Sequence, residues 1–569
     1  MDLMLATQHY VNEMIRLAGP GMKVILMDKE TTSMISCAFA QSEMMQKEVY
    51  LFERIDSGAI REPIKFLKCV VYVRPTPENI QLLSEELRTP KYAQYYIYFS
   101  NIISKADIKI LAEADEQETV REVREFYADV ISLVPHVCSL GIPNCYETPF
   151  NMSASIFRRT LQGLIAILLA IKKRPVIRYQ TSSRDSQRLA DELSKVFVRE
   201  ETLFDGCKPD TVMVILDRSE DPVSPLLNQW TYEAMVHELI GINNNRVIME
   251  NVPADGQKNI VLSPQHDEFY TKNMYLNFGD IGQNIKALMN DYQKKAQTHQ
   301  QLESINDMKR FVEQYPQFKK ISGTVTKHVQ LVGELSRIVT TENLLEISEL
   351  EQNIVNTGEH GQCLETLKRL LQHPKTSELN ALRLVMLYAL RFENNANNSL
   401  NSVVDVLKQK NMPQRHINNV RLLLDYAGAK RRHHDVFGNR SAMEMTKRFI
   451  KGLKGVENIY TQHEPYITQL IDQVSRGRLP DSLFASSDAS QINTRFENVI
   501  IFIIGGCTYE ESAFVNSLNA KRSQSGSSGQ LRVLLASTYV HNTRSFIQQL
   551  AHLGDTSHLS SAAATSSFR

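Results

Sequence analysis

The sequence has no excess of either charge and few cysteines. Lysine plus arginine and aspartate plus glutamate number 64 each, so the chain lacks the positive field that attracts nucleic acid or anionic lipid. We therefore expect no nucleic-acid partner. The seven cysteines occur singly with no C-x-x-C pair, a pattern typical of small buried side chains in a reducing compartment. With 42% hydrophobic and 22% charged residues, the 569-residue chain is predicted to fold into several domains.

The sequence also lacks a hydrophobic run of membrane-spanning length. The most apolar stretch, LQGLIAILLAI (161–171), is shorter than the roughly twenty residues that a bilayer requires, and Pro175 follows soon after it. This stretch predicts a buried helix packed against a sheet. Residues 1–19 contain acidic side chains and no small-residue cleavage site, which is unlike a signal peptide. We expect no direct membrane span, so work at membranes would depend on partners.

No complete catalytic motif is present. There is no G-x-x-x-x-G-K-[ST] phosphate loop, no G-x-G-x-x-G between a strand and a helix, and no G-x-S-x-G elbow. The nearest match, IIGGCTYEE (503–511), has a strand, two glycines and a helix-like segment. It lacks the lysine and the Ser/Thr pair that would hold phosphate and magnesium, so it predicts a structural turn. We assign no catalytic residue and no cofactor.

Two histidine-containing segments fall short of a metal site. VHELIG (236–241) begins like a zinc-protease helix, but Gly241 replaces the second histidine, so an ordinary helix is expected. In KRRHHDVF (430–437) the neighbours His433 and His434 would diverge by about 100° on a helix and could not easily share one metal. That segment predicts a solvated basic loop, and no metal ligand is assigned.

Two groups of short apolar runs predict two sheets. Runs at 22–28, 69–75, 95–100 and 130–135 alternate with helical patterns, as in a mostly parallel sheet. A second set lies at 211–222, where Asp217, Asp221 and Pro222 close the strand pattern, and at 498–506 and 531–537. Because two isolated strands cannot form a stable domain, the two downstream runs are expected to complete the sheet that begins near residue 211. The intervening helical block, about 246–474, is then an insertion in the second domain.

The helical block contains amphipathic helices. Apolar residues recur at helical spacing in two segments, listed here as Ile281, Ile285, Leu288, Met289 and Tyr292, and Val325, Val329, Val332, Leu335 and Val339. Between these segments, Pro316 lies inside a helical pattern, where we expect it to kink, break or terminate the helix.

Five segments resemble a known family over nearly the whole chain. They are LDRSEDPVSPLLNQWTYEAMVHELIGI (216–242), FIIGGCTYEE (502–511), YPQFKK (315–320), KGLKGVENIYTQHEP (451–465) and ISKADIKILAEADEQE (103–118). The chain resembles the Sec/Munc (SM) family of SNARE regulators, and within it a branch that serves trans-Golgi and early-endosomal fusion. The family has no known enzymatic activity and needs no cofactor.

The resemblance implies a fold of mixed α/β and α class. It is a three-domain arch, with two α/β parallel-sheet domains and a large, mainly helical domain inserted in the second. The implied bounds are 1–136 for domain one, 137–245 plus 475–569 for domain two, and 246–474 for domain three.

In the family, a shallow apolar pocket on domain one takes the short N-terminal peptide of a syntaxin. The resemblance places its apolar positions and one acidic position here at Ile108, Leu111, Val120, Val123 and Glu125. Considered alone, Ile108, Leu111 and Ala112 share one helical face and Val120 with Val123 another, so two helices could form a groove. The alternative is that these apolar side chains all pack on the first sheet.

Two further surfaces follow from the resemblance. Asp28 matches an acidic position in the family's central cleft, which holds the helical syntaxin core, although Ser33 replaces an arginine of some relatives. The alternative for Asp28 is a turn or cap residue after a strand. A SNARE-templating hairpin in domain three would present Leu302, Ile305, Met308 and Phe311 to a vesicle SNARE, with Pro316 tuning its two arrangements. Hairpin core is the alternative for these apolar residues.

The sequence-based hypothesis is a cytoplasmic protein, peripherally associated with endosomal and Golgi membranes through SNAREs. Its implied partners are a syntaxin-type (Qa) SNARE, a vesicle (R) SNARE, the assembled SNARE bundle and a Rab effector, and the chain is expected to be monomeric. Two other classes remain open. One is an α/β enzyme using a nucleotide or sugar nucleotide between its sheets. The other is a coat or tether scaffold, which would show no preference for free SNARE termini.

Overall fold

The computed structural model describes residues 1–147, 150–208, 210–252, 256–300, 305–437, 462–487, 496–525 and 531–553, with the backbone alone for 295–300, 305–320, 357 and 522–525. The chain falls into two compact units. The first comprises Met1–Arg218, Leu470–Cys507 and Val515–Val540, and the second comprises Ser219–Gln469, Thr508–Phe514 and the segment from His541. Within the described residues, no helix is both long and apolar enough to cross a bilayer.

The first unit begins with a five-stranded parallel sheet. Its strands are β1 (Lys23–Met27), β2 (Val49–Arg54), β3 (Ile64–Val73), β4 (Tyr92–Phe99) and β5 (Val120–Glu125), in the spatial order β2-β1-β3-β4-β5. The apolar runs predicted at 22–28, 69–75 and 95–100 form the three central strands. They are apolar on both faces because helices cover both sides of a parallel sheet.

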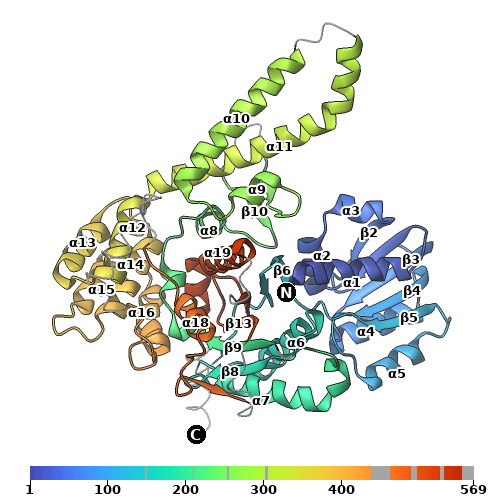
Figure 1. The fold of residues 1–569 in the computed structure, drawn as a ribbon, viewed down its shortest axis with the longest axis horizontal. Coiled ribbons are helices and arrows are strands. Elements are labelled where there is room, and N and C mark those ends of the chain that lie inside the picture. Colours follow the sequence, from blue (N-terminus) through green and yellow to red (C-terminus); the bar gives the residue numbers. More distant parts are fainter. Residues whose placement is uncertain are drawn as a thin grey trace. The chain divides into compact units, whose positions relative to one another are not determined.

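Helices cover this sheet in two layers (Figure 1). The helices of the first domain-like region are α1 (Leu3–Leu17), α2 (Lys29–Ala38), α3 (Gln41–Gln46), α4 (Pro77–Arg88) and α5 (Lys105–Ala114). Val11 and Met14 of α1 pack with Ile25 and Tyr72 on one face of the sheet. Side chains of α4 and α5, including Leu111, pack on the other face. Both layers bury apolar side chains completely, which fixes the register of the strands.

The second sheet of the first unit has seven strands. They are β6 (Ile131–Val134), β7 (Val137–Ser139), β8 (Val176–Gln180), β9 (Thr211–Asp217), β12 (Phe484–Ser486), β13 (Asn498–Ile504) and β14 (Arg532–Ser537), in the order β12-β8-β9-β13-β14-β7-β6. β13 pairs in parallel with β9 on one side and with β14 on the other. The prediction that the two downstream runs complete the sheet begun near residue 211 is confirmed.

The run at 130–135 does not belong to the first sheet, so its assignment there was wrong. Its strand β6 pairs antiparallel with β7 across a two-residue turn at 135–136, and β7 pairs with β14 of the second sheet. Apolar composition shows that a segment is a strand but not which neighbour it joins, and here the tight turn and β7 decide the pairing.

The apolar stretch 161–171 forms a buried helix, as predicted. Helix α6 (Ala154–Ala170) begins at Ser153, whose hydroxyl accepts a hydrogen bond from the Ile156 N–H. Leu164, Ile167 and Leu168 are completely buried. Helix α7 (Arg184–Arg199) follows it after β8.

The second unit is mainly helical. Its principal elements are α8 (Tyr232–Leu239), β10 (Arg246–Ile248), β11 (Asn259–Val261), α9 (Glu268–Asn273), α10 (Phe278–Gln300), α11 (Ile305–Thr341), α12 (Leu344–Gln352), α13 (His360–Gln372), α14 (Glu378–Phe392), α15 (Leu400–Gln409) and α16 (Gln414–Ala427). Two more helices, α18 (Tyr466–Ser475) and α19 (Tyr509–Ser525), contribute residues to both units.

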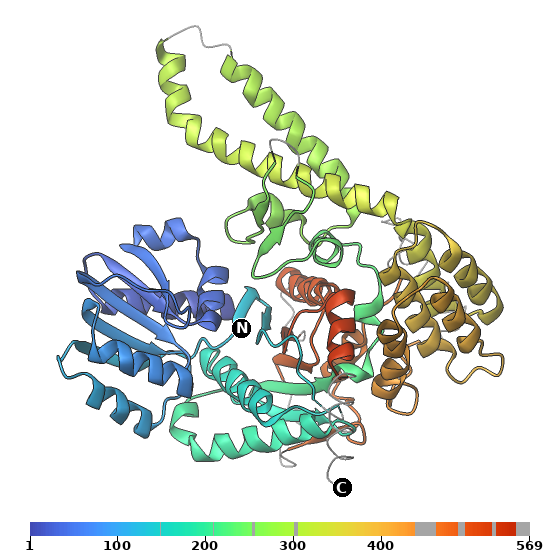
Figure 2. The same ribbon diagram turned by 180° about the vertical axis from the view of Figure 1, so that it is seen from behind.

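Helices α10 and α11 form a long antiparallel hairpin, which Figures 1 and 2 show from opposite sides. Ile281 of α10 and Leu335 of α11 are fully buried members of the predicted apolar stripes. Helix α11 continues through Pro316, so this residue neither breaks nor terminates it. Both views show α11 bent along its length, which is the effect expected when proline removes a backbone hydrogen bond.

Candidate functional site

Helix α5 packs one large apolar side chain on the sheet and exposes two others to solvent. The Ser104 hydroxyl caps the helix by accepting a hydrogen bond from the Asp107 N–H at 3.1 Å. Leu111 is 4% exposed and belongs to the core on the sheet, whereas Ile108 is 41% and Ile110 is 46% exposed. The helix therefore offers two large apolar side chains to a partner while a third anchors it.

The segment 120–125 is the edge strand β5 and not the second helix that we expected. It pairs in parallel with β4, with Val120 opposite Tyr95 and Val123 opposite Ile97. Val120 packs against the core that contains Leu111, whereas Val123 is 40% exposed. The helical prediction was wrong because two valines in a six-residue segment are compatible with the spacing of a helix and with that of a strand. Pairing to β4 decides for the strand.

Glu125, at the end of β5, holds the loop that leads into α5. Its Oε1 accepts a hydrogen bond from the Ile103 N–H at 2.8 Å, and its Oε2 accepts one from the Tyr127 hydroxyl at 2.7 Å. Burial and this bond raise the pKa of Tyr127. The carboxylate therefore fixes the start of α5 relative to β5. Of the sequence-predicted pocket residues, Leu111 and Val120 share one core cluster, while Ile108 and Val123 lie on the surface.

Asp28 is a buried helix cap. It is the N-cap of α2 and forms a capping box with Thr31. Its Oδ2 also accepts hydrogen bonds from the Arg74 N–H and the Asn79 side chain, each at 2.7 Å. Asp28 is only 4% exposed, and this burial raises the pKa of its carboxyl group despite these hydrogen bonds. The cap interpretation of this residue is confirmed, and its carboxylate is occupied within the first unit.

The proposed hairpin residues can be placed only in part. Leu302 lies outside the described residues. Ile305, Met308, Phe311 and Pro316 lie in the N-terminal part of α11, where only the backbone is described. The described part of the hairpin places Tyr292 of α10 beside Ser322 of α11, with 3.4 Å between their hydroxyl oxygens.

The strand-turn-helix segment 216–242 is organised by Asp221. Its Oδ1 accepts hydrogen bonds from the backbone of Val223 and Ser224, and its Oδ2 accepts one from the Ser224 hydroxyl at 2.6 Å and one from the Tyr466 N–H at 3.1 Å. The acidic residues after β9 therefore build a turn. The VHELIG segment lies in α8 and in the turn after it, as expected.

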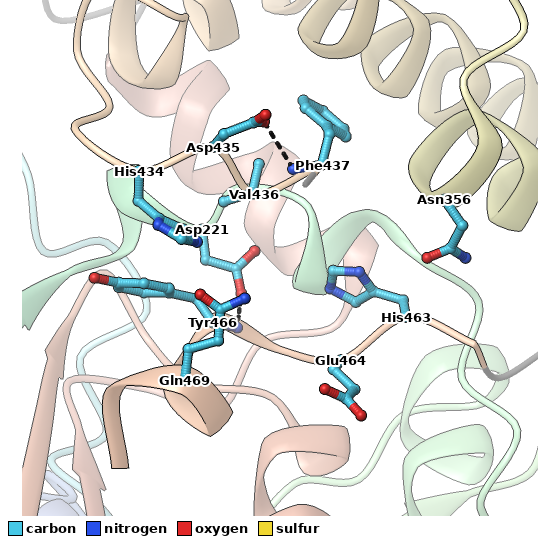
Figure 3. A pocket seen from close by; sticks show the side chains of 10 residues that line it. All are labelled: Asp221, Asn356, His434, Asp435, Val436, Phe437, His463, Glu464, Tyr466 and Gln469. Carbon is cyan, nitrogen blue, oxygen red and sulfur yellow. Dashed lines mark hydrogen bonds between the residues drawn. The ribbon is translucent and has the colours of Figure 1, made fainter. Parts of the chain in front are cut away.

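A small polar cavity lies beside this turn in the second unit (Figure 3). Its lining residues are Asp221, Asn356, His434, Asp435, Val436, Phe437, His463, Glu464, Tyr466 and Gln469. The His434 ring lies 4.5 Å from the Tyr466 ring, and burial lowers the pKa of His434. The cavity has a volume of about 20 Å³, enough for one or two waters and far below the several hundred Å³ of a nucleotide pocket.

The histidine and glycine segments have structural roles in the described chain. His433 and His434 lie in a loop, as expected, but the backbone N–H of His433 donates to the buried Glu220, so the loop is only partly solvated. Gly505 and Gly506 have φ of 87° and 88°, and the Gly505 N–H donates to the Thr538 hydroxyl at 3.1 Å. Among the described residues, no three histidine, cysteine, aspartate or glutamate side chains are grouped to hold a metal.

Comparison with known proteins identifies the family. The Sec1 family model matches residues 23–549. The chain belongs to the Sec1 family. It is 50% identical over 559 residues to "Vacuolar protein sorting-associated protein 45" of Mus musculus and of Homo sapiens, with 97% of this chain and 97% of each relative covered. A solved "SM Protein Vps45 in Complex with Qa SNARE Tlg2 (1-310)" is 43% identical, covers 98% of this chain and 99% of that one, and has a TM-score of 0.89. The resemblance to the SM family is thereby confirmed.

Within this Sec1-family chain, two features of the site were missed by sequence reasoning. Ile110 of α5 is exposed, as Ile108 is, which the ADIKIL pattern could have indicated because its apolar residues exceed one helical face. The second feature is a pair of buried acids, of which Glu233 lies on α8 and Glu510 on α19. Burial raises the pKa of Glu233 to about 8 and that of Glu510 to about 7.

Replacing Glu233 with glutamine is expected to stabilise this Sec1-family protein at pH 7.5. The Tyr270 hydroxyl donates to Oε1 at 2.9 Å, but Oε2 has no hydrogen-bond partner among the described residues. The pKa of Glu233 in the folded protein is raised above its unfolded value of 4.5. The contribution of this residue to stability is therefore greatest below pH 4.5 and is lost as the pH rises through about 8. Glutamine mimics the protonated acid, so the variant should gain about 1–3 kcal/mol at pH 7.5 and little at pH 5.

Urea unfolding at the two pH values measures this difference. The control is Glu268→Gln, because Glu268 is an exposed glutamate of α9 and its neutralisation should change stability little at either pH. A Glu233→Gln protein with the same loss of stability between pH 5 and pH 7.5 as the wild type would contradict the prediction.

Proposed function

We propose that this chain is a non-enzymatic protein that binds a syntaxin-type (Qa) SNARE and templates SNARE complex assembly for vesicle fusion. The strongest support is the 43% identity, over 98% of the chain, to a solved family member in complex with a Qa SNARE. The similarity to vacuolar protein sorting-associated protein 45 supports endosomal and trans-Golgi traffic as its setting. In this proposal the protein is cytoplasmic and reaches those membranes peripherally, through SNAREs.

In this proposal the chain has three domains, and the two SNARE-binding roles belong to different domains. Domain one (1–136) binds the N-terminal peptide of the Qa SNARE. Domain two comprises residues 137–245 plus 475–569, and domain three (246–474) carries the hairpin that aligns a vesicle (R) SNARE. The assembled SNARE bundle and a Rab effector complete the set of partners, and the chain acts as a monomer.

On domain one, the peptide surface combines an anchored floor with exposed contacts. Leu111 belongs to the core and Val120 packs against it, so the floor has a fixed position, while Ile108 and Val123 are exposed and available to apolar peptide side chains. Glu125 acts by holding the loop before α5. A preformed surface of this kind avoids the ordering cost that weakens binding by flexible segments.

The other two proposed surfaces depend on α2 and on the hairpin. Asp28 contributes to the central cleft by capping α2, since its carboxylate already accepts hydrogen bonds within the unit. Leu302, Ile305, Met308 and Phe311 are proposed to contact the vesicle SNARE. The proline at 316 is proposed to bring two arrangements of the hairpin closer in energy.

The substitution Ile108→Asp is expected to weaken binding of a Qa SNARE N-terminal peptide by at least about 30-fold. A charge placed in an apolar contact loses its hydration without gaining a partner, and central contacts of this kind contribute about 2 kcal/mol or more. Isothermal titration of the purified chain with N-terminal peptides of several syntaxins measures the effect. Ile108 is 41% exposed, so the fold should tolerate the change.

The control for this experiment is Val198→Asp on α7. Val198 is 75% exposed and lies in the same unit, so its substitution tests whether any new surface charge weakens the peptide. Equal loss in both variants would overturn the peptide surface on α5. If no syntaxin peptide binds the wild type, that surface fails for this chain and the hairpin would have to carry the function alone.

The same protein sample tests the two alternative functions, which are an α/β enzyme that uses a nucleotide or sugar nucleotide and a coat or tether scaffold. Stabilisation by any member of a panel of nucleotides and sugar nucleotides in a thermal-shift assay would favour the enzyme. Equal binding of free and blocked SNARE termini would favour a scaffold.

A further inference from the structure

One polar side chain interrupts the buried apolar stripe of α11. Among the described residues 321–341, the buried positions are Val325, Leu331, Leu335, Val339 and, as the single polar member, His328, which is 0% exposed. A polar group in such a position is costly unless both of its nitrogens have partners. His328 has a partner for each.

The imidazole links α11 to two other helices of the second unit. Its Nε2 lies 2.9 Å from Oδ2 of Asp267, and its Nδ1 lies 2.7 Å from the Tyr232 hydroxyl oxygen. Because a carboxylate only accepts, Nε2–H donates to Asp267, which leaves Nδ1 to accept from Tyr232. Tyr232 is the first residue of α8 and Asp267 is the N-cap of α9. One side chain thus joins three helices.

Neighbouring groups hold this network rigidly. Asp267 also caps α9 by accepting from the Tyr270 N–H at 2.9 Å, and it forms an ion pair with Lys327. Although burial alone would raise it, the hydrogen bonds from His328 and Lys327 hold the pKa of Asp267 well below its usual range. The Phe269 ring lies 4.7 Å from the imidazole. The carboxylate therefore stays charged and the ring stays in place.

Because the network lies far from the N-terminal end of α11, a small rotation at His328 would move that end by several ångströms. An α-helix rises about 1.5 Å per residue, so the part of α11 from Ile305 to His328 extends about 35 Å beyond the imidazole. A rotation of about 10° at this point would move the far end by about 6 Å. Polar contacts of α11 close to this point, such as those between Gln257 and Gln330, are exposed to solvent and form weaker restraints.

We propose that His328 is a positioning residue, and that the Tyr232–His328–Asp267 network sets the direction of the α10–α11 hairpin relative to α8 and α9. This inference rests on the proposed function, because the direction of the hairpin then decides where an aligned SNARE helix lies. Templating requires two SNARE helices to meet in register. Loss of the network slows assembly without affecting the peptide surface on α5.

The test compares full-length proteins in which Cys207 is changed to serine and spin labels are attached at Lys294→Cys on α10 and Lys272→Cys on α9. Double electron–electron resonance gives the distance distribution between the two labels. His328→Phe keeps a ring but removes both hydrogen bonds, and Tyr232→Phe removes one. Lys294 lies two residues beyond Tyr292, which contacts Ser322, so the label is only about 12 Å along the hairpin from His328. We expect the distribution to shift or broaden by at least about 2 Å in His328→Phe, and by less in Tyr232→Phe.

His360→Phe is the matched control. His360 on α13 makes a similar contact, with 2.9 Å between its Nε2 and the Tyr388 hydroxyl oxygen, but it lies outside the hairpin. Its substitution should cost similar stability and leave the distance distribution unchanged. If His328→Phe fails to fold, Tyr232→Phe carries the test alone.

The second readout is the rate of SNARE assembly, measured beside the affinity for the Qa SNARE N-terminal peptide. We expect His328→Phe to slow assembly at least about fivefold with unchanged peptide affinity. An unchanged distance distribution in folded His328→Phe overturns the proposal, and so does a shifted distribution with an unchanged assembly rate. A wild-type protein that neither binds a SNARE peptide nor speeds assembly would instead overturn the proposed function, whereas the distance measurement does not depend on SNAREs.

Discussion

Replacing Arg383 with methionine is expected to lower the free energy of unfolding of the second unit by about 3–5 kcal/mol. The Arg383 guanidinium donates to Glu238 of α8 at 2.8 Å and to Glu351 of α12 at 3.5 Å, and it lies on α14. The side chains of all three residues are at most 2% exposed. Methionine would fill the space but leave two carboxylates buried without their cation.

The cost is large because the charged form of Glu351 is only weakly stabilised even in the wild-type protein. Burial raises the pKa of Glu351 to about 7 even with Arg383 beside it, and Asn228 supplies two of its hydrogen bonds at 2.9 Å. Without the guanidinium, these acids would have to be protonated or would repel each other. The loss should therefore be smaller at pH 5 than at pH 7.5.

The single tryptophan reports on this region. Trp230 is 3% exposed, and its Nε1–H donates to the Ser348 hydroxyl of α12 at 3.1 Å, so its fluorescence follows unfolding of the second unit in urea. The control is Arg369→Met, because the ion pair of Arg369 with Glu346 is exposed and should contribute less than about 1 kcal/mol. Equal urea midpoints for the Arg383 and Arg369 variants would show that the buried cation is dispensable.

The sequence predicted the long, strongly apolar elements and failed where short segments are decided by their neighbours. β9, β13 and β14 are buried on both faces, so their composition indicates strands whatever they pair with. The segment that forms β5, VREVRE, has no such pattern and becomes a strand because β4 offers an edge. Short strands such as β2 and β8 were missed for the same reason.

The candidate site was predictable to a similar extent. The resemblance placed the proposed peptide surface on the segment that forms α5 and β5. It did not indicate that Leu111 is buried and Ile108 exposed, because this depends on how α5 rests on the sheet. Asp28 could be predicted as a cap because a strand ends immediately before it. The partners of His328 lie 61 and 96 positions away along the chain, so no local pattern indicates the network.

A second large effect is expected for Asp129→Asn, which should lower the stability of the first unit by about 2–4 kcal/mol. Asp129 is 0% exposed and accepts hydrogen bonds from Arg74 at 2.8 Å, Asn101 at 2.9 Å, Ser100 at 3.2 Å and Arg159 at 3.4 Å. An asparagine would remove the negative charge and turn one oxygen into an amide that donates toward these donors. Among the described residues, the two arginines would keep Glu30 alone, which is 47% exposed, as a shared anionic partner.

This network joins the first sheet to α6. Arg74 follows β3, Arg159 lies on α6, and Arg74 also donates to the Gln162 side chain of α6 at 2.9 Å. Hydrogen exchange followed by mass spectrometry locates the effect, and we expect faster exchange in α6 and in the loop around Asp129 in Asp129→Asn. Glu30→Gln is the control, because it removes the solvent-exposed acid of the same network and should change exchange much less. If exchange in α6 is unaltered, apolar packing alone holds this helix against the first sheet, and the buried charges do not contribute to that contact.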